Sequence, residues 1–189
     1  MRNWIRNWRV FGVILLRMKH TALALLAASL LCSTRALAQD EPDIVVEADH
    51  RVSGAVMVRV PVDQARAMLA DPVRVAEIEG GTARIRVLSE DSCKNLHTAI
   101  AHPVASVEYT SRSCPTANGF HTKLVQSDTL EDFEAEWTVE EVEGGTLLRY
   151  VVRTIPRIAV PQFIVDRQSK GSVKQLLQRV KVHLEAPLR

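Results

Sequence analysis

Residues 150–185, YVVRTIPRIAVPQFIVDRQSKGSVKQLLQRVKVHLE, change character in the middle. The segment begins with the alternation of a β-strand, passes through a loop that holds two prolines, and ends in a helical pattern. In its second half, apolar side chains recur at the spacing of one helix face, at Val173, Leu176, Leu177, Val180 and Leu184. The sequence therefore predicts a helix of about 25 residues that begins near Pro161 and follows directly from a strand.

The residues before this helix predict a sheet with one dry and one wet face. In residues 131–141, EDFEAEWTVEE, apolar side chains alternate with acidic ones, and residues 146–155 return after Gly144-Gly145 with a similar alternation. Further strands are expected over residues 52–60, 82–89, 94–102, 105–113 and 119–128, with short helices beginning at Pro61 and Pro72. Because a sheet with a single apolar face must be covered, the last helix is expected to cross seven antiparallel strands.

The N-terminus carries the pattern of a secretory signal peptide. A basic start at Met18-Lys19-His20 precedes a short apolar run, and Ala36 and Ala38 form a small-residue cleavage site. Residues 1–38 are therefore predicted to be removed. Residues 1–17 precede an already complete signal, so either translation starts at Met18 or the signal is a longer one in two parts. Residues 39–50 are then a flexible acidic N-terminus, residues 51–187 form one domain, and the protein is secreted across the inner membrane to the periplasm.

Removal of the leader reverses the sign of the net charge. Residues 1–38 hold six of the 24 Lys and Arg side chains and none of the 22 Asp and Glu, so 18 basic and 22 acidic side chains remain, and the formal charge moves from +2 to −4. The basic balance of the full chain is therefore a property of the leader, and nothing in the rest indicates nucleic-acid binding.

Two cysteines remain after the leader, Cys93 and Cys114. A hairpin turning at residues 102–105, with Pro103 at the second position of the turn, places residues opposite each other when their numbers add up to 207. Cys93 and Cys114 satisfy this condition and fall on a non-hydrogen-bonded pair, where the two strands approach most closely. We therefore predict a structural disulfide, as expected for a secreted protein.

Four stretches in this order resemble the helix-grip fold of the START/Bet v 1-like superfamily, often called SRPBCC, and are nearest to its coenzyme-Q-binding and polyketide-cyclase-like START group. They are VPVDQARAMLADPVRVAEI at 60–78, AHPVASVEYTSRS at 101–113, FEAEWTVEEVEGGTLLRYVVRTIP at 133–156 and VPQFIVDRQSKGSVKQLLQRVKVHL at 160–184. The resemblance implies an α+β fold in which the sheet and a long C-terminal helix enclose a cavity for lipids, isoprenoid quinones, sterols or polyketides. Export and a disulfide distinguish this chain from most relatives.

The resemblance makes the inward aromatic and apolar side chains candidates for ligand contact, with plain core packing as the alternative for each. The predicted ligand-binding residues are Phe133, Trp137, Leu148 and Tyr150 in the cavity wall, and Phe163 and Ile164 near its mouth. Trp137 and Tyr150 also carry polar groups that can orient a ligand in an apolar pocket.

No catalytic or metal-binding motif is found in the sequence, so no cofactor and no metal site are predicted. His97, His102 and His121 lack metal-site spacing, and regular alternation puts the first two on opposite faces of a strand. Glu108 is a candidate base only if it faces inward; otherwise it is a solvated carboxylate.

The sequence thus predicts a monomeric exported binding protein for an apolar small molecule or lipid, with transient membrane contact. One alternative is a cyclase or aromatase-type enzyme that acts on a polyketide-like substrate in the same cavity. The other is a structural or partner-binding domain with a filled cavity. A bound lipid favours the first function, and an inward acid–base pair favours the enzyme.

The cleavage site yields a direct prediction. If export removes residues 1–38, the intact mass of the exported protein should correspond to a chain that starts at Gln39. A retained leader or a lipid-modified N-terminus would show that the segment serves as an anchor instead.

Overall fold

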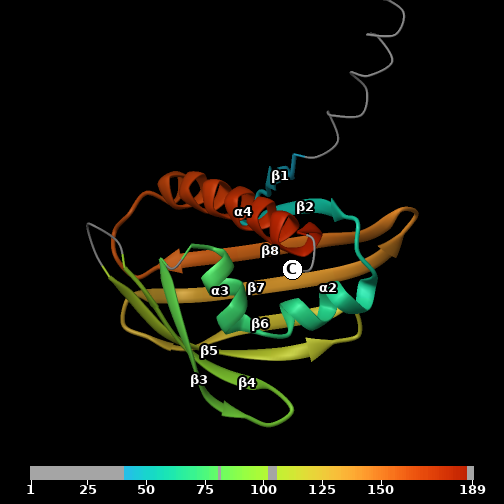
Figure 1. Ribbon diagram of the computed structural model, residues 1–189. Coiled ribbons are helices and arrows are strands. Elements are labelled where there is room, and N and C mark those ends of the chain that lie inside the picture. Colours follow the sequence, from blue (N-terminus) through green and yellow to red (C-terminus); the bar gives the residue numbers. More distant parts are fainter. Residues whose placement is uncertain (1–40, 81, 102–105, 187–189) are drawn as a thin grey trace, which may run out of the picture. The chain divides into compact units, whose positions relative to one another are not determined.

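The sheet is antiparallel and contains eight strands, in the order β1-β2-β8-β7-β6-β5-β4-β3 (Figure 1). A computed structural model of the chain describes residues 41–80, 82–101 and 106–186. The strands are β1 (Asp43–Val46), β2 (Val52–Val58), β3 (Ala83–Glu90), β4 (Lys94–Ile100), β5 (Val107–Thr116), β6 (Gly119–Ser127), β7 (Leu130–Val142) and β8 (Gly145–Pro156). The predicted leader and its cleavage site lie outside the described residues.

Three helices cover one face of the sheet, which we call the inner face (Figure 1). They are α2 (Val62–Leu69), α3 (Pro72–Ile78) and α4 (Gln162–Glu185). Asp71 caps α3, because its carboxylate accepts hydrogen bonds from the backbone N–H groups of Val73 and Arg74, each at 3.1 Å. Among the described residues, no helix is both long enough and apolar enough to cross a membrane. The α+β class, the two short helices and the long last helix agree with the sequence analysis.

The predicted number of seven strands is wrong, because β1 adds an eighth. Residues 39–50 were expected to form a flexible acidic N-terminus, yet Asp43–Val46 pairs with β2, and Ile44 lies opposite Gly54. Ile44 packs against the core, and Glu41 forms an ion pair with Lys174 of α4. A strand of four residues that begins at Asp43 is too short to display a reliable alternation, so this strand depends on the pairing edge that β2 supplies.

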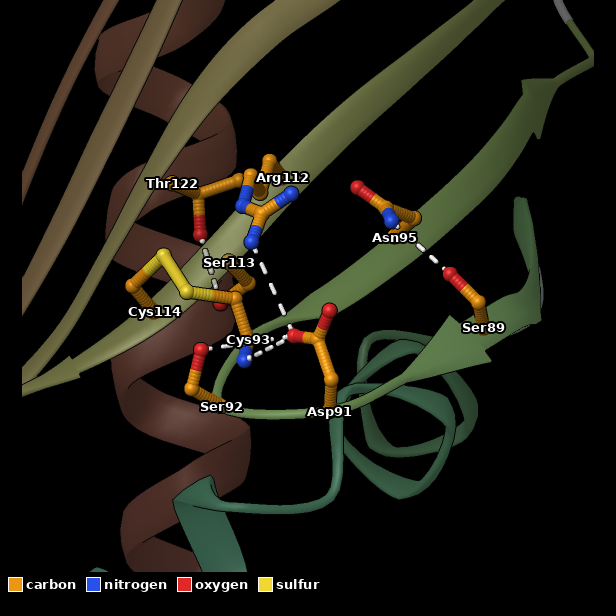
Figure 2. The surroundings of a disulfide bond; sticks show 9 residues. All are labelled: Ser89, Asp91, Ser92, Cys93, Asn95, Arg112, Ser113, Cys114 and Thr122. Atoms are coloured by element: carbon orange, nitrogen blue, oxygen red, sulfur yellow. Dashed lines mark hydrogen bonds and ion pairs between the residues drawn. A yellow bond between two sulfur atoms is a disulfide. The ribbon is translucent and has the colours of Figure 1, made fainter.

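The disulfide lies at the open end of the β4–β5 hairpin (Figure 2). The predicted turn at residues 102–105 lies outside the described residues, but the pairing of Lys94 with Ser113 and of Ile100 with Val107 confirms the predicted register. The Cα atoms of Cys93 and Cys114 are 4.3 Å apart, the close spacing of a non-hydrogen-bonded pair. The predicted disulfide is therefore confirmed.

The turn before Cys93 is held by one carboxylate. Asp91 accepts a hydrogen bond of 2.8 Å from the Cys93 backbone N–H and lies 3.6 Å from the Arg112 guanidinium on β5 (Figure 2). The hydrogen bond from Cys93 is the main reason why the pKa of Asp91 lies below its usual value. The disulfide and this carboxylate together join the β3–β4 turn to β5.

The main hydrophobic core lies between the second half of α4, α2 and strands β2, β7 and β8. The apolar stripe predicted for the last helix is confirmed, since all five of its members are buried, and the alternating side chains of β2 and β8 face them. Leu177, Val180 and Leu148 have no exposed surface. This core holds α4 against one side of the sheet.

Removal of the disulfide should loosen the hairpin without changing the fold. Cys93→Ala should lower the free energy of unfolding by about 2–4 kcal/mol, because the cross-link restricts the unfolded chain. Chemical denaturation measures this change, and Thr116→Ala, at an exposed position on β5, is a suitable control. Alkylation of the native, unreduced protein should find neither Cys93 nor Cys114 reactive; labelling of both would contradict the bond.

Candidate functional site

Aromatic side chains from β5, β7 and β8 gather on the inner face. Tyr109 packs against Phe133 with ring centroids 4.8 Å apart, and Trp137 packs against Tyr150 with ring centroids 4.5 Å apart. The strand register explains the second pair, because Trp137 and Tyr150 are direct cross-strand neighbours on β7 and β8. We call these four residues the aromatic row.

Most of the aromatic row is not fully covered. Phe133, Trp137 and Tyr150 are partly exposed and lie at the margin of the main core, whereas Tyr109 is buried. Phe120 of β6, opposite Trp137 in the sheet, is also partly exposed. The inner face therefore consists of a closed aliphatic part beside α4 and an aromatic part with accessible surface.

Polar groups accompany the aromatic row. Burial raises the pKa of Tyr109 to about 12, and a hydrogen bond with Thr98 partly offsets this effect. Burial also raises the pKa of Tyr150 well above that of a free phenol, and the Tyr109 phenol and Glu79 carboxylate raise it further. The Glu79 carboxylate and the two hydroxyl groups therefore lie within electrostatic range of one another, and we call these three groups the polar cluster.

Glu79 comes from the end of α3. Burial raises the pKa of its carboxyl group, and the Arg179 guanidinium of α4 partly offsets that shift. The Arg179 side chain also donates a hydrogen bond to the backbone carbonyl of Glu79. Gly80, the next residue, adopts φ +102°, a conformation that favours glycine, and an added Cβ would collide with the Arg179 guanidinium. The α3 end is therefore joined closely to α4 beside the polar cluster.

The predicted ligand-binding residues fall into three environments. Phe133, Trp137 and Tyr150 lie together in the aromatic row, as described above. Leu148 has no exposed surface and lies within the main core, so a ligand could reach it only if the core opened. Phe163 and Ile164 lie on the first turn of α4, where they are 70% and 45% exposed.

An open groove is found elsewhere on the surface. It has a volume of about 430 Å³, lies between α3 and α4, and shares no lining residue with the aromatic row. Its lining residues are Ile78, Gln178, Arg179, Val182, His183 and Ala186. We do not regard it as the binding site, because it is open to solvent and displays neither buried aromatic rings nor the polar cluster.

The histidine and carboxylate candidates lie away from this site. His121 is 2.8 Å from Glu134, whose pKa is lowered mainly by this hydrogen bond. His97 is 3.8 Å from Glu108, whose side chain is 65% exposed, so Glu108 is a solvated carboxylate and not an inward base. His102 lies outside the described residues. Among those that the structure describes, no cluster of three or more His, Cys, Asp or Glu side chains could hold a metal ion.

The sequence analysis did not identify Glu79 and Tyr109 as site residues. Alternation along β5 puts Tyr109 on the same face as the buried Ser111, so this signal was present in the sequence. Glu79 lies at the C-terminal end of a short helix, directly before a glycine, and a residue at such a position is expected to be exposed to solvent. Only the packing of α3 against the sheet and against α4 shows that its carboxyl group is partly buried.

The sequence matches no protein-family model and no curated protein. Its fold, however, is similar to that of solved proteins. A START superfamily protein from Mycobacterium smegmatis superposes with a TM-score of 0.63 and 16% identity over 71% of this chain and 97% of that one.

Two further solved structures share the fold. A STAR-related lipid transfer protein from Xanthomonas axonopodis gives a TM-score of 0.59 at 12% identity, over 78% of this chain and 100% of that one. The di-domain ARO/CYC StfQ from the steffimycin biosynthetic pathway gives a TM-score of 0.59 at 13% identity, over 71% of this chain and 50% of that one. The chain therefore has the START/Bet v 1-like fold, as the sequence predicted.

Ionisation of the two tyrosines tests the buried cluster. Tyr109 and Tyr150 are the only tyrosines of the chain, so phenolate absorbance reports on both. The folded protein should not form phenolate near pH 10, where unfolded tyrosine ionises, because the pKa of both groups is raised. Since the folded state then holds protons more tightly than the unfolded state, stability should fall as the pH rises above about 10.

A pH titration of the absorbance, with the urea-unfolded protein as reference, makes this measurement. Thermal melting across the same pH range tests the linked loss of stability. A native tyrosine that titrates near pH 10 would place that phenol in solvent and contradict the described packing.

Proposed function

We propose that this protein is exported to the periplasm and binds an apolar small molecule or lipid, such as an isoprenoid quinone, a sterol or a fatty-acid-like molecule, in a cavity over the aromatic row. The observation that carries this proposal is the incomplete cover of the row. Tyr150 lies deep enough for burial to raise its pKa, yet part of its surface stays accessible. A deep side chain with accessible surface is expected where an internal recess accepts a ligand.

The chemistry of the inner face is suited to such a ligand. Phe133, Trp137 and Tyr150 present flat apolar surfaces, and the polar cluster supplies a few fixed groups that can orient a hydroxyl or carbonyl oxygen. Two solved proteins of similar fold are a STAR-related lipid transfer protein and an ARO/CYC protein, and this likeness supports an apolar ligand. The disulfide agrees with export to an oxidising compartment.

An enzyme of the cyclase or aromatase type is the second candidate, and Glu79 favours it. A partly buried carboxyl group with a raised pKa, within electrostatic range of two phenols, can act as a general acid or base on a bound polyketide-like substrate. Glu79→Gln distinguishes the two functions, because it keeps the shape of the site but removes the acid. A binder should retain its ligand in this variant, whereas an enzyme should lose turnover.

Trp137 allows binding to be measured directly. Once residues 1–38 are removed, it is the only tryptophan left in the chain, so its fluorescence reports on the aromatic row alone. Titration with a short-tailed benzoquinone, dehydroergosterol or a brominated fatty acid should give saturable quenching or energy transfer for at least one of the three. Native mass spectrometry of protein purified without detergent should show the natural ligand as an added mass.

Matched variants locate the site. Phe133→Ala should weaken binding about tenfold, because an aromatic contact worth about 1.4 kcal/mol is lost. Val125→Ala is the control, since Val125 is 58% exposed and lies outside the aromatic row. If no probe gives a saturable signal and the purified protein carries no added mass, the binding function is wrong and a filled structural domain is the better description.

A further inference from the structure

The two halves of α4 differ in how they are held. Residues 173–185 carry every buried side chain of the helix, including Val173 and Leu177. None of residues 162–172, all of which the structure describes, is buried. An added Cβ at Gly171, between the two halves, would contact nothing within 4 Å. The first half of α4 therefore lies on the protein without contributing a side chain to the core.

Polar contacts fix the orientation of this first half. The His50 imidazole, in the β1–β2 turn, lies 2.9 Å from the Asp166 carboxylate. The Gln162 amide donates to the other oxygen of Asp166 at 2.9 Å and to the backbone carbonyl of Thr154 at 3.3 Å. Because these contacts are all on the side that faces the sheet, the opposite side of the helix is presented to solvent in a defined orientation.

That opposite side carries an apolar tip. Phe163 is 70% exposed, Ile158 in the preceding loop is 58% exposed, and Ile164 is 45% exposed. Three large apolar side chains thus lie exposed within seven residues. Within the described part of the chain, the other exposed large apolar side chains are dispersed over β1, β2, β3, β6 and the second half of α4.

Two cations continue the same helix face. Phe163, Arg167 and Lys170 follow the i, i+4 and i+7 spacing of one face. Both cations are exposed, and neither forms an ion pair with any residue in the described part of the chain. We call Ile158, Phe163, Ile164, Arg167 and Lys170 the docking face.

We propose that the docking face binds the surface of an anionic lipid bilayer. An apolar tip followed by cations one and two turns later is the pattern of a helix that inserts shallowly among headgroups, where each cation near anionic lipid adds about 1 kcal/mol. A stable protein interface takes about 800 Å² from each partner, which three side chains cannot supply. A bilayer accepts so small a tip.

The docking face extends the proposed function and does not depend on it. It would bring a periplasmic binding protein to the membrane that supplies or receives its ligand, but binding to a bilayer requires no occupied cavity. The acidic side chains near this face lie off it: Asp128 is in the β6–β7 turn, Glu131 is at the start of β7, and the Asp166 carboxylate is held by His50 and Gln162. Attraction to anionic lipid is therefore confined to the side of the helix that carries Arg167 and Lys170.

Vesicle flotation tests the proposal with the processed chain from Gln39. The wild type should bind vesicles of phosphatidylcholine mixed with phosphatidylglycerol about tenfold more tightly than vesicles of phosphatidylcholine alone, and added salt should weaken this binding. Phe163→Ser should lower the affinity about tenfold through loss of inserted apolar surface. Lys170→Glu should abolish the preference for the anionic vesicles.

Two controls match these variants in exposure and chemistry. Val182→Ser removes an apolar side chain that is 71% exposed on the second half of the same helix, and it should leave vesicle binding unchanged. Arg86→Glu reverses an exposed charge on β3 and should also leave it unchanged. All four variants should melt at the wild-type temperature, since none of these side chains belongs to the core.

Three results would overturn the proposal. The first is a wild type that floats with neither vesicle, as expected if the face serves a protein partner or a second copy. The second is a Val182→Ser variant that loses as much affinity as Phe163→Ser. The third is loss of flotation in Trp137→Leu, because capture of single lipids on the inner face would then explain the signal. A Trp137→Leu variant that floats normally with vesicles but fails to bind the small probes would support membrane binding by the docking face independently of the cavity.

Discussion

The contact between α4 and β2 at Gly54 is the constraint on which the rest of the structure depends. A Cβ at this position would lie 2.6 Å from side-chain atoms of both Leu177 and Ile44. The absence of a side chain lets the second half of α4 lie close to the sheet, where Leu177 and Val180 are completely buried. Any larger residue would push α4 and β1 away from β2, and the one-sided sheet would lose most of its cover.

This close packing also determines where a ligand can lie. The aliphatic half of the inner face, beneath α4, is filled by the side chains of the main core. The aromatic half, over β5 to β8, is covered less completely by the short helices, so Phe133 and Trp137 keep accessible surface. Rings and buried polar groups occupy this region, where the requirement for dense packing is weaker. The residues that stabilise the fold and the residues of the candidate site thus occupy neighbouring parts of the inner face.

Helix α4 is divided in a similar way: its second half packs in the core, and its first half carries the docking face. The second half holds the fold, with Lys181 donating hydrogen bonds to the backbone carbonyl of Met57 and to Glu185. The first half is held by Gln162 and by the hydrogen bond between His50 and Asp166. Segments with few buried contacts open at a lower cost in free energy than core segments. A helix built in this way can change its first turns without unfolding the domain.

Local periodicity was enough to determine much of this architecture. The stripe from Val173 to Leu184, the alternation through Trp137 and the addition rule for the hairpin depend on residues close in sequence, so they predicted the last helix, the sheet face and the disulfide. The capping of α3 by Asp71 belongs to the same class of local signals. The strand that these rules missed, β1, is short and forms only against the free edge of β2.

The tertiary structure alone decided which inward residues are core and which are site. Alternation puts Leu148 and Tyr150 on the same face, yet Leu148 is fully buried in the main core, whereas Tyr150 packs at the margin of that core and keeps part of its surface accessible. Likewise, no sequence pattern distinguishes Glu79 from an exposed helix end, because its partial burial depends on tertiary packing, which includes the contact with Arg179, 100 residues away in the chain. The sequence by itself determined the faces of the elements. How deeply each inward side chain is buried was decided only by the packing of helices distant in the chain on the sheet. Burial depends on what covers a residue and not on its neighbours in sequence.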